Sequence, residues 1–402
     1  MLRSISTTES KAEDIALSEY EAQCLRLIGE SLASRNNWWG SESQVQRSVI
    51  NVTMLSVGVY QVTFRDVVGT VTVGDLQIQV IPKIPQNHFN FLISQSEIAP
   101  RLAKERTSIE PGSHLYEVVS RWCVIAAENL LKRGLSRDYE IQREDLSELR
   151  GTLLPIETAL IINRGIPLVS CEFEELSDDA PLNRIVKTAC EIISRSSTVS
   201  TAVRRSARSV AHRMSGIGKI RAPDMRVRVN RLTKAYSKVV PLSMLILNGM
   251  GISSAYGDII GTSFLIRTPE LIEDGLRSCL QQSLASINIT KKGLMLGDTG
   301  LTANPDLIFG QNIAIGDVKY KYLNGHWSRD DLSQISFFAT AFHSRQAALL
   351  GFVNDLDSPL PRPVPIGPIT ARAFGWVASQ DISPESSSII LCENIEKWIK
   401  NH

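Results

Sequence analysis

Two carboxylates and a lysine lie on two short apolar segments that are separated by turn-prone residues. Asp306 is in the first segment (305–309), and Asp317 and Lys319 are in the second (313–319). This pattern predicts a β-hairpin. Because strand side chains alternate between faces, Asp317 and Lys319 share one face. Charge on such apolar strands is unfavourable unless it is compensated, and a divalent metal ion is the usual compensator for clustered carboxylates.

The flanking segments strengthen this interpretation, since a D-x-K tripeptide or a P-D dipeptide alone would indicate no more than an ordinary turn. Upstream, Thr268 and Pro269 predict the N-cap and first position of a helix that carries Glu273 about one turn in. Downstream, acidic residues begin a helix at about 330–338 that carries Gln334 on its first turns. The order of a glutamate helix, a P-D hairpin, a D-x-K strand and a glutamine helix resembles the core of the PD-(D/E)XK nucleases.

Composition bounds the remaining possibilities. The 402 residues are 43% hydrophobic and 21% charged, which is ordinary for a globular protein with two or three domains. The net charge is +1, so contacts with nucleic acid must come from local patches. The six cysteines show no C-x-x-C spacing, which is typical of reduced core thiols. With no membrane-spanning apolar run and no signal peptide, we expect a cytoplasmic protein without membrane contact.

The chain before the hairpin predicts a β-rich portion followed by helices. Residues 1–12 read as a frayed end and 14–32 as a helix, and four strands follow at 49–52, 57–62, 68–73 and 76–81. Trp38-Trp39-Gly40 could stack on a base, although packing against a sheet is the commoner role. Further helices are expected at 114–131 and from Ala180.

These elements predict an α/β (α+β) fold in three domains. We expect a small β-rich partner-binding domain at 1–105 and a helical connecting domain at 106–245. Residues 246–402 would form a restriction-endonuclease-like mixed sheet flanked by helices.

Several further motifs resemble the McrC family, the endonuclease subunit of McrBC-type, modification-dependent restriction systems. The motifs that carry the resemblance are I-P-K-I (81–84), R-G-L-x-R-x-Y (133–139), L-R-G (149–151), the C-x-F-x-E-L-S-x-D to N-R-I-x-K block (171–187), L-I-E (271–273), P-D and D-V-K-Y-K (317–321). The resemblance covers most of the chain from about residue 60. It departs from related nucleases where Phe338 replaces the tyrosine that often follows the glutamine, and the first fifty residues match no motif.

The resemblance implies metal-assisted hydrolysis of double-stranded DNA. Mg²⁺, or Mn²⁺ in its place, would be held by Asp306, Asp317, the Val318 carbonyl and Glu273, as one ion or two. Lys319 would orient a water or stabilise the transition state, and Gln334 would hold Lys319 or a phosphate. Tyr320 and Lys321 are candidates for supporting roles, Lys321 also as a DNA contact.

The resemblance also implies a partner. The sequence has no G-x-x-x-x-G-K-[ST] loop, so an McrB-like AAA+ GTPase ring would hydrolyse the nucleotide. We expect the ring to contact the N-terminal portion, where a turn residue such as Arg65 could act on a nucleotide pocket in trans. On this view a fragment lacking residues 1–105 keeps the metal site but does not engage the ring.

A basic segment between residues 195 and 234 has eleven lysines and arginines against one acid, Asp224. Arg204, Arg205 and Arg208 would lie along one side of a helix, where they could contact DNA phosphates or face solvent. No base-reading motif accompanies them, so we expect positioning and not sequence recognition.

Two other functions remain open. One is a non-catalytic adaptor that stimulates the AAA+ ring through an idle nuclease fold, and the other is a standalone RecB-like repair nuclease. Four intact site residues argue against the adaptor, and the long N-terminal portion argues against the standalone enzyme.

Overall fold

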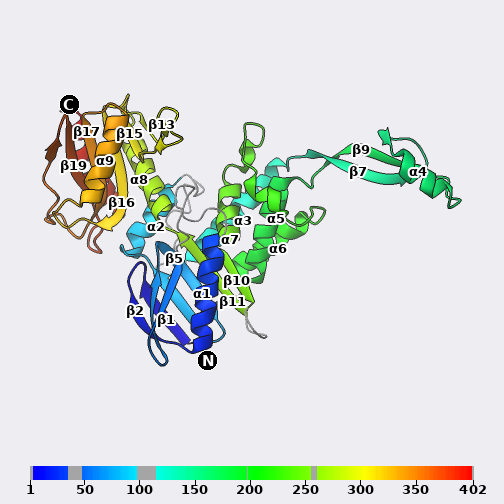
Figure 1. The fold of residues 1–402 in the computed structure, drawn as a ribbon, viewed down its shortest axis with the longest axis horizontal. Coiled ribbons are helices and arrows are strands. Elements are labelled where there is room, and N and C mark those ends of the chain that lie inside the picture. Colours follow the sequence, from blue (N-terminus) through cyan, green and yellow to red (C-terminus); the bar gives the residue numbers. More distant parts are fainter. Residues whose placement is uncertain (1–2, 35–47, 97–114, 197, 255–259, 401–402) are drawn as a thin grey trace. The chain divides into compact units, whose positions relative to one another are not determined.

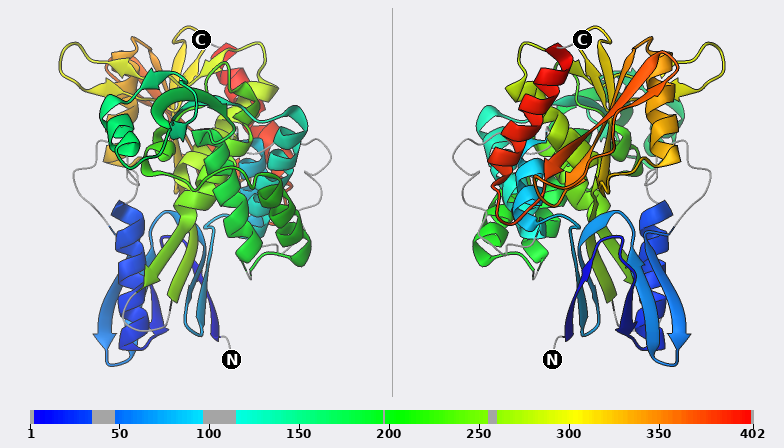
Figure 2. Two further views of the ribbon diagram at one scale, coloured as in Figure 1. Left: turned by 90° about the vertical axis from the view of Figure 1, so that its right-hand side faces the viewer. Right: turned by 90° about the vertical axis from the view of Figure 1, so that its left-hand side faces the viewer.

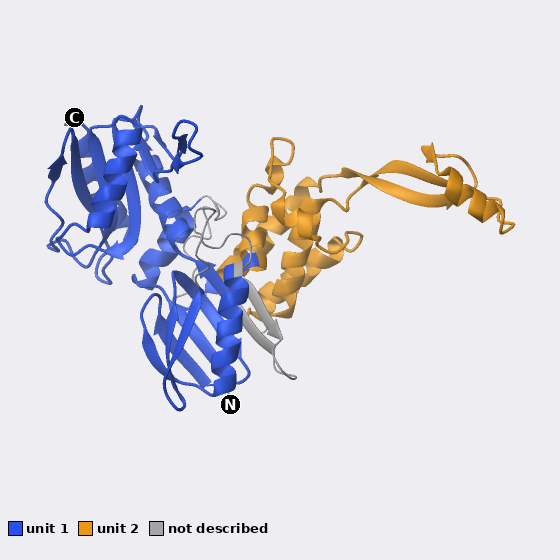
Figure 3. Ribbon diagram, in the orientation of Figure 1, with its two compact units in different colours: residues 1–115, 248–402 blue, residues 116–247 orange. Residues whose placement is uncertain are grey.

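The structure is a computed structural model that describes residues 3–34, 48–96, 115–196, 198–254 and 260–400 (Figure 1). It divides into two compact units, one formed by residues 1–115 with 248–402 and the other by residues 116–247 (Figure 3). The Trp38-Trp39 pair lies outside the described residues. No helix in the described ranges is long and apolar enough to span a membrane.

Alternating β-branched residues build the N-terminal part of the first unit. Strands β3 (Ile50–Ser56), β4 (Val59–Phe64), β5 (Val67–Val73) and β6 (Leu76–Ile81) coincide with the four expected strands. They belong to two sheets, with orders β2-β4-β3 and β1-β6-β5-β11-β10. Helix α1 (Glu19–Ser34) buries Leu25, Ile28 and Leu32 in their shared core. The strand predictions are therefore confirmed.

Four strands in these sheets differ from expectation. Arg3–Thr8, expected to be frayed, forms β1 and pairs in parallel with β6. Backbone pairing at a sheet edge does not require apolar side chains, so composition did not reveal it. Strand β2 (Glu13–Ala16) begins a segment expected to be entirely helical. Strand β11 (Ile260–Arg267) pairs with β5 and with β10 (Met250–Ser254), so two strands assigned to the nuclease domain complete the N-terminal sheet.

A mixed six-stranded sheet forms the C-terminal part of this unit, in the order β12-β15-β16-β17-β19-β18. Its strands are β12 (Ile289–Thr290), β15 (Leu307–Phe309), β16 (Ala314–Tyr322), β17 (Gln346–Val353), β18 (Val364–Ile366) and β19 (Ile369–Val377). The pairs β16–β17 and β17–β19 are parallel and the others antiparallel. Helices α9 (Arg329–Ala341) and α10 (Pro384–Lys400) cover opposite faces (Figure 2). A small hairpin, β13 (Leu294–Met295) with β14 (Thr302–Ala303), follows β12.

Helix α2 (Gln86–Gln95) joins the two parts of the first unit. It packs on α8 (Pro269–Ser283) so closely that a Cβ on Gly275 would lie 2.3 Å from the Leu92 carbonyl oxygen. One turn earlier on α2, His88 Nδ1 accepts a hydrogen bond from Trp376 Nε1 of β19 at 3.1 Å. Residues 86–95 therefore complete the core beside the C-terminal sheet, although the sequence division placed them in the first domain.

The second unit contains helices and a β-rich arm. Helices α3 (Leu115–Arg133) and α5 (Pro181–Arg195) lie where they were expected, and α6 (Thr201–Arg213), two short 3-10 helices (Ala222–Arg226 and Lys234–Tyr236) and α7 (Val239–Gly249) follow. The arm was not expected in a helical domain. It is an antiparallel sheet, β7 (Asp138–Leu146), β9 (Val169–Ser177) and β8 (Thr152–Leu153), with helix α4 (Pro155–Ile162) (Figure 1).

Candidate active site

The β15–β16 hairpin brings the two aspartates of the site together. Asp306 immediately precedes β15, and Asp317 lies in the middle of β16. Gly310 (φ 59°) and Asn312 (φ 65°) take left-handed conformations in the turn, which these two residue types tolerate best. Asp306 Oδ2 accepts a hydrogen bond from the Val318 amide at 3.0 Å. The hairpin thus fixes the Asp306 carboxylate beside the strand that carries Asp317.

Burial and mutual repulsion make this pair of carboxylates electrostatically unusual. Asp306 and Asp317 are 7% and 3% exposed. Burial, and then the charge of Asp306, raise the pKa of Asp317 to about 6, while the Lys319 ammonium acts in the opposite direction. Two buried carboxylates whose charges repel each other in this way favour binding of a cation between or beside them.

Lys319 and Gln334 face the same side of the sheet as Asp317. Lys319 Nζ lies 2.7 Å from Asp317 Oδ2 and donates a hydrogen bond to Gln334 Oε1 at 2.7 Å. Within the described residues, Asp317 Oδ2 accepts no hydrogen bond of good geometry, so its contact with Lys319 is an ion pair. Ser328 caps the helix that positions Gln334, because its hydroxyl accepts from the Asp331 amide at 3.2 Å. The expected acidic residues occupy the first turn of α9 but do not cap it.

Glu273 reaches this site through a lysine that sequence reasoning missed. Lys291 follows β12, and its Nζ lies 2.8 Å from Asp306 Oδ1 and 3.3 Å from Glu273 Oε2. Burial, followed by the charge of Asp306, raises the pKa of Glu273 to about 8, and Lys291 offsets part of this shift. A lysine after a strand that pairs with the P-D strand was the available signal, but β12 has only two residues and was not recognised.

The oxygen donors of the site suit the divalent metal ion expected from the sequence. Among the described residues, no three Asp, Glu, His or Cys side chains converge closely enough to hold a metal ion. Asp306 and Asp317 nevertheless form a buried pair of oxygen donors, and each carboxylate lies beside a lysine ammonium that compensates its charge. Hard oxygen ligands of this kind suit Mg²⁺ or Mn²⁺. The pair fits a divalent cation. Glu273 lies next to the pair, and Lys291 bridges the Glu273 and Asp306 carboxylates.

Two neighbours of Lys319 have structural contacts. Lys321 Nζ donates to Asp331 Oδ2 at 2.5 Å and ties β16 to α9, so any contact with DNA would compete with this ion pair. Tyr320 points to the opposite face of the sheet, where its ring packs against Phe352 at a centroid distance of 5.7 Å. The supporting role in the metal site that we expected of Tyr320 is therefore wrong, because strand alternation turns it away from Asp317.

Comparison with known proteins identifies the family. The sequence model of the family described as "McrBC 5-methylcytosine restriction system component" matches residues 62–352, which is well over half of the chain. The chain belongs to this family. No curated protein matches it. Together with the nuclease-type hairpin, membership of this McrBC family makes the chain the nuclease subunit of a restriction system.

A solved structure shows the same fold. A refined half-complex of Thermococcus gammatolerans McrB AAA+ hexamers with bound McrC contains a chain with a TM-score of 0.58 and 17% identity. The match covers 98% of this chain and 100% of that one. The cryo-EM structure of the T. gammatolerans McrBC complex matches with a TM-score of 0.45 and 18% identity, over 70% and 88% of the two chains.

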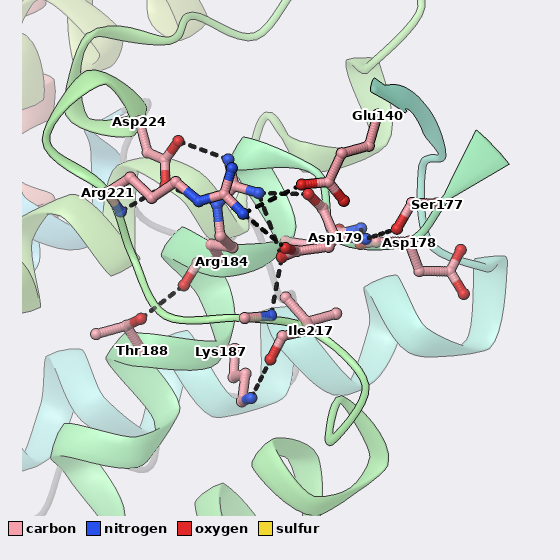
Figure 4. A network of polar contacts seen from close by, with 12 residues as sticks. Glu140, Ser177, Asp178, Asp179, Arg184, Lys187, Thr188, Ile217, Arg221 and Asp224 are labelled. Atoms are coloured by element: carbon pink, nitrogen blue, oxygen red, sulfur yellow. Dashed lines mark hydrogen bonds and ion pairs between the residues drawn. The ribbon is translucent and has the colours of Figure 1, made fainter. Parts of the chain in front are cut away.

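The longest motif that suggested McrC forms a polar network in the second unit (Figure 4). Arg184 of α5 donates hydrogen bonds of 2.8 Å from Nε and Nη2 to the two carboxylate oxygens of Asp224. Asp179 lies at the base of the arm. Its Oδ1 is 3.2 Å from Arg184 Nη1 and its Oδ2 is 3.1 Å from Arg221 Nη2. These contacts hold the loop that follows α6 against α5 and against the end of β9. This part of the McrC resemblance is therefore structural and lies outside the nuclease hairpin.

The basic segment remains largely unneutralised. Its one acid, Asp224, is 2% exposed and paired with Arg184, so it cannot offset surface charge. Arg205 and Arg208 are exposed on α6 and have no acidic partner among the described residues, while Arg204 is half-buried and donates to Thr201 Oγ1 at 3.1 Å. Val203, Ala207 and Val210 are the buried face of α6. The exposed face thus presents isolated cations.

Proposed function

We propose that this chain is a metal-dependent DNA endonuclease that is activated by an AAA+ GTPase partner. The observation that carries the proposal is the buried pair of carboxylates on the β15–β16 hairpin, with Lys319 held between Asp317 and Gln334. Metal-assisted phosphodiester hydrolysis is the chemistry that this donor set supports best.

Each residue of the site has a defined task in this proposal. Asp306 and Asp317, with the Val318 carbonyl, would hold Mg²⁺ or Mn²⁺, and Glu273 would complete the set once it is released from Lys291. When bound, the ion would polarise a phosphoryl oxygen and lower the pKa of a coordinated water from about 15.7. Lys319 places a positive charge beside Asp317, where it can orient the attacking water or stabilise the pentavalent phosphorane. Gln334 restricts Lys319 to that position through its hydrogen bond.

The second unit offers surfaces for DNA and for the partner. The exposed arginines of α6 support contact with the phosphate backbone. On the arm, α4 buries only Thr158 and exposes Ile156 (74%), Leu160 (54%) and Ile162 (55%). An apolar patch of this kind is typical of a protein interface. The similar T. gammatolerans assembly contains McrC bound to McrB hexamers, and we extend this type of partner to the present chain.

The N-terminal portion supplies a second candidate contact for the ring. Its β3–β4 hairpin exposes Met54, Leu55 and Val57 at the tip, the last with 93% of its surface accessible. Arg65 lies at the turn between β4 and β5. The expectation that residues 1–105 bind the partner therefore remains a proposal, beside the arm.

The alternatives are less well supported. In an idle adaptor, two buried aspartates and a positioned lysine would destabilise the fold without a compensating role. A standalone RecB-like nuclease would have no use for the exposed apolar helix of the arm.

The test separates the nuclease from the adaptor. Asp317→Ala should abolish cleavage of DNA containing 5-methylcytosine in the presence of Mg²⁺, GTP and the partner. The same variant should stimulate GTP hydrolysis by the partner as well as the wild type, because Asp317 contacts none of the residues proposed to bind the ring. Cleavage at the wild-type rate would show that Asp317 has no catalytic role.

A further inference from the structure

Lys291 is the one site residue whose role the proposed function does not explain. Its ammonium contacts Asp306 Oδ1 at 2.8 Å and Glu273 Oε2 at 3.3 Å, and its side chain is 40% exposed. It therefore lies at the margin of the site, between two carboxylates that belong to different elements. A second ammonium, that of Lys319, contacts Asp317. The three carboxylates of the site are thus met by two lysines.

The two oxygens of Asp306 are not equivalent. Oδ2 accepts the Val318 amide, a bond within the hairpin, at 3.0 Å. Oδ1 is the oxygen that Lys291 contacts. Oδ1 takes no part in the hairpin bond, so a metal ion can bind there without disturbing the hairpin, and Lys291 already contacts this oxygen.

The backbone places Lys291 in this position. Strand β12 pairs with β15, with Thr290 opposite Ile308, so Lys291, the residue after β12, comes level with the start of β15. Two residues later, a Cβ on Gly293 would lie 2.2 Å from Asn304 Oδ1. Only glycine fits this close approach without a shift of Asn304. The segment 291–293 thus runs close beside residues 304–306, and Lys291 lies within reach of Asp306.

We propose that Lys291 competes with a divalent cation for the carboxylates of Glu273 and Asp306. This inference rests on the proposed function, since it takes Asp306 as a metal ligand. Lys291 acts as a tethered cation: it neutralises the two carboxylates, lowers the affinity of the site for the metal ion, and moves away when the ion binds. The half-exposed side chain has solvent on one side into which the ammonium can move.

The test measures Mn²⁺ binding to the full chain by isothermal titration calorimetry, without DNA or partner. Lys291→Met should bind Mn²⁺ about fivefold more tightly or better, because a positive charge within a few ångströms of the ion is removed. Lys291→Gln, which keeps hydrogen-bonding groups, should also bind Mn²⁺ more tightly than the wild type. Lys291→Arg keeps the positive charge, so its Mn²⁺ affinity should remain near that of the wild type. Lys292→Met, which removes an exposed neighbouring lysine, is the matched control and should leave the affinity unchanged.

A second readout uses the wild-type chain and does not depend on a folded variant. Mn²⁺ should increase the labelling of Lys291 by an amine-reactive reagent relative to Lys292, as quantified by mass spectrometry. Unchanged Mn²⁺ affinity in both neutral variants, or unchanged labelling, would overturn the inference. If Asp317→Ala still abolishes Mn²⁺ binding in that case, the proposed function stands and only the role of Lys291 is wrong. If the wild type binds no Mn²⁺ at all, the proposed metal site itself is wrong.

Discussion

Glu9 is a buried carboxylate outside the metal site. Glu9 is 2% exposed and accepts a hydrogen bond from the Thr268 hydroxyl. Thr268 is the N-cap residue of α8, as expected, but its side chain contacts Glu9 and makes no capping bond. Burial raises the pKa of Glu9, and the nearby Lys83 charge reduces that shift. The glutamate thus joins the end of β1 to the start of the helix that carries Glu273.

Glu9→Gln should therefore change the dependence of stability on pH. Because the pKa of Glu9 is higher in the folded chain than the ordinary value of 4.5, folding favours the protonated form. The wild type loses stability as pH rises from about that ordinary value through the folded pKa, whereas glutamine stays neutral. The variant should have a higher Tm than the wild type at pH 8 and a similar Tm near pH 4.5.

Thermal melts across this pH range check the prediction. Glu30→Gln, on the exposed side of α1, is the control and should show no such crossover. A Glu9→Gln variant that is less stable than the wild type at pH 8 would mean that the ionised carboxylate, paired with Lys83, stabilises the fold.

At the scale of elements, local patterns predicted the hairpin and helices α3, α5, α8 and α9, whereas the 17-residue helix α10 was not predicted. Two short apolar segments and a turn containing Gly310 and Asn312 specify the β15–β16 pair without help from distant residues. Pro269 likewise marks the first turn of α8. The pairing of β11 with β5 joins residues about two hundred positions apart, and no local pattern encodes it. Lys291 was missed for the same reason, because its contacts depend on a two-residue strand pairing.

Helix α6 yields a prediction about DNA binding. Replacing Arg205 and Arg208 with glutamine should weaken binding to all DNA sequences alike, since these exposed side chains would contact phosphates and not bases. Each phosphate contact that is lost should reduce the slope of log K against log salt by about 0.9. Fluorescence anisotropy over a salt series measures this slope.

The matched control removes two exposed lysines from another helix. Lys397→Gln with Lys400→Gln on α10 changes the net charge equally and should leave the slope unchanged. An equal loss of slope in both double variants would indicate a general effect of charge and no specific contact by α6.

For the molecule as a whole, the structure shows that the chain cannot be cut at residue 105 without breaking the core of the first unit. The expected division at residue 105 would remove α2, whose His88 and Leu92 pack against β19 and α8. It would also leave β11 without its partner β5. A fragment lacking residues 1–105 would expose these apolar surfaces, so it is unsuitable for separating ring binding from cleavage. The proposed contacts are better tested by point variants on the arm and on the β3–β4 tip.

The central claim is that Asp306 and Asp317 form the metal site of a nuclease, and cleavage by an Asp306 variant tests it most directly. The assay uses DNA containing 5-methylcytosine with Mg²⁺, GTP and the partner, and compares the wild type with Asp306→Asn and Asp298→Asn. Asp298 is an exposed acid in the β13–β14 loop and serves as the matched control. The account predicts that the wild type and Asp298→Asn cleave, that Asp306→Asn does not, and that a chelator abolishes all cleavage. Full cleavage by Asp306→Asn, or cleavage by the wild type that survives chelation, would contradict it.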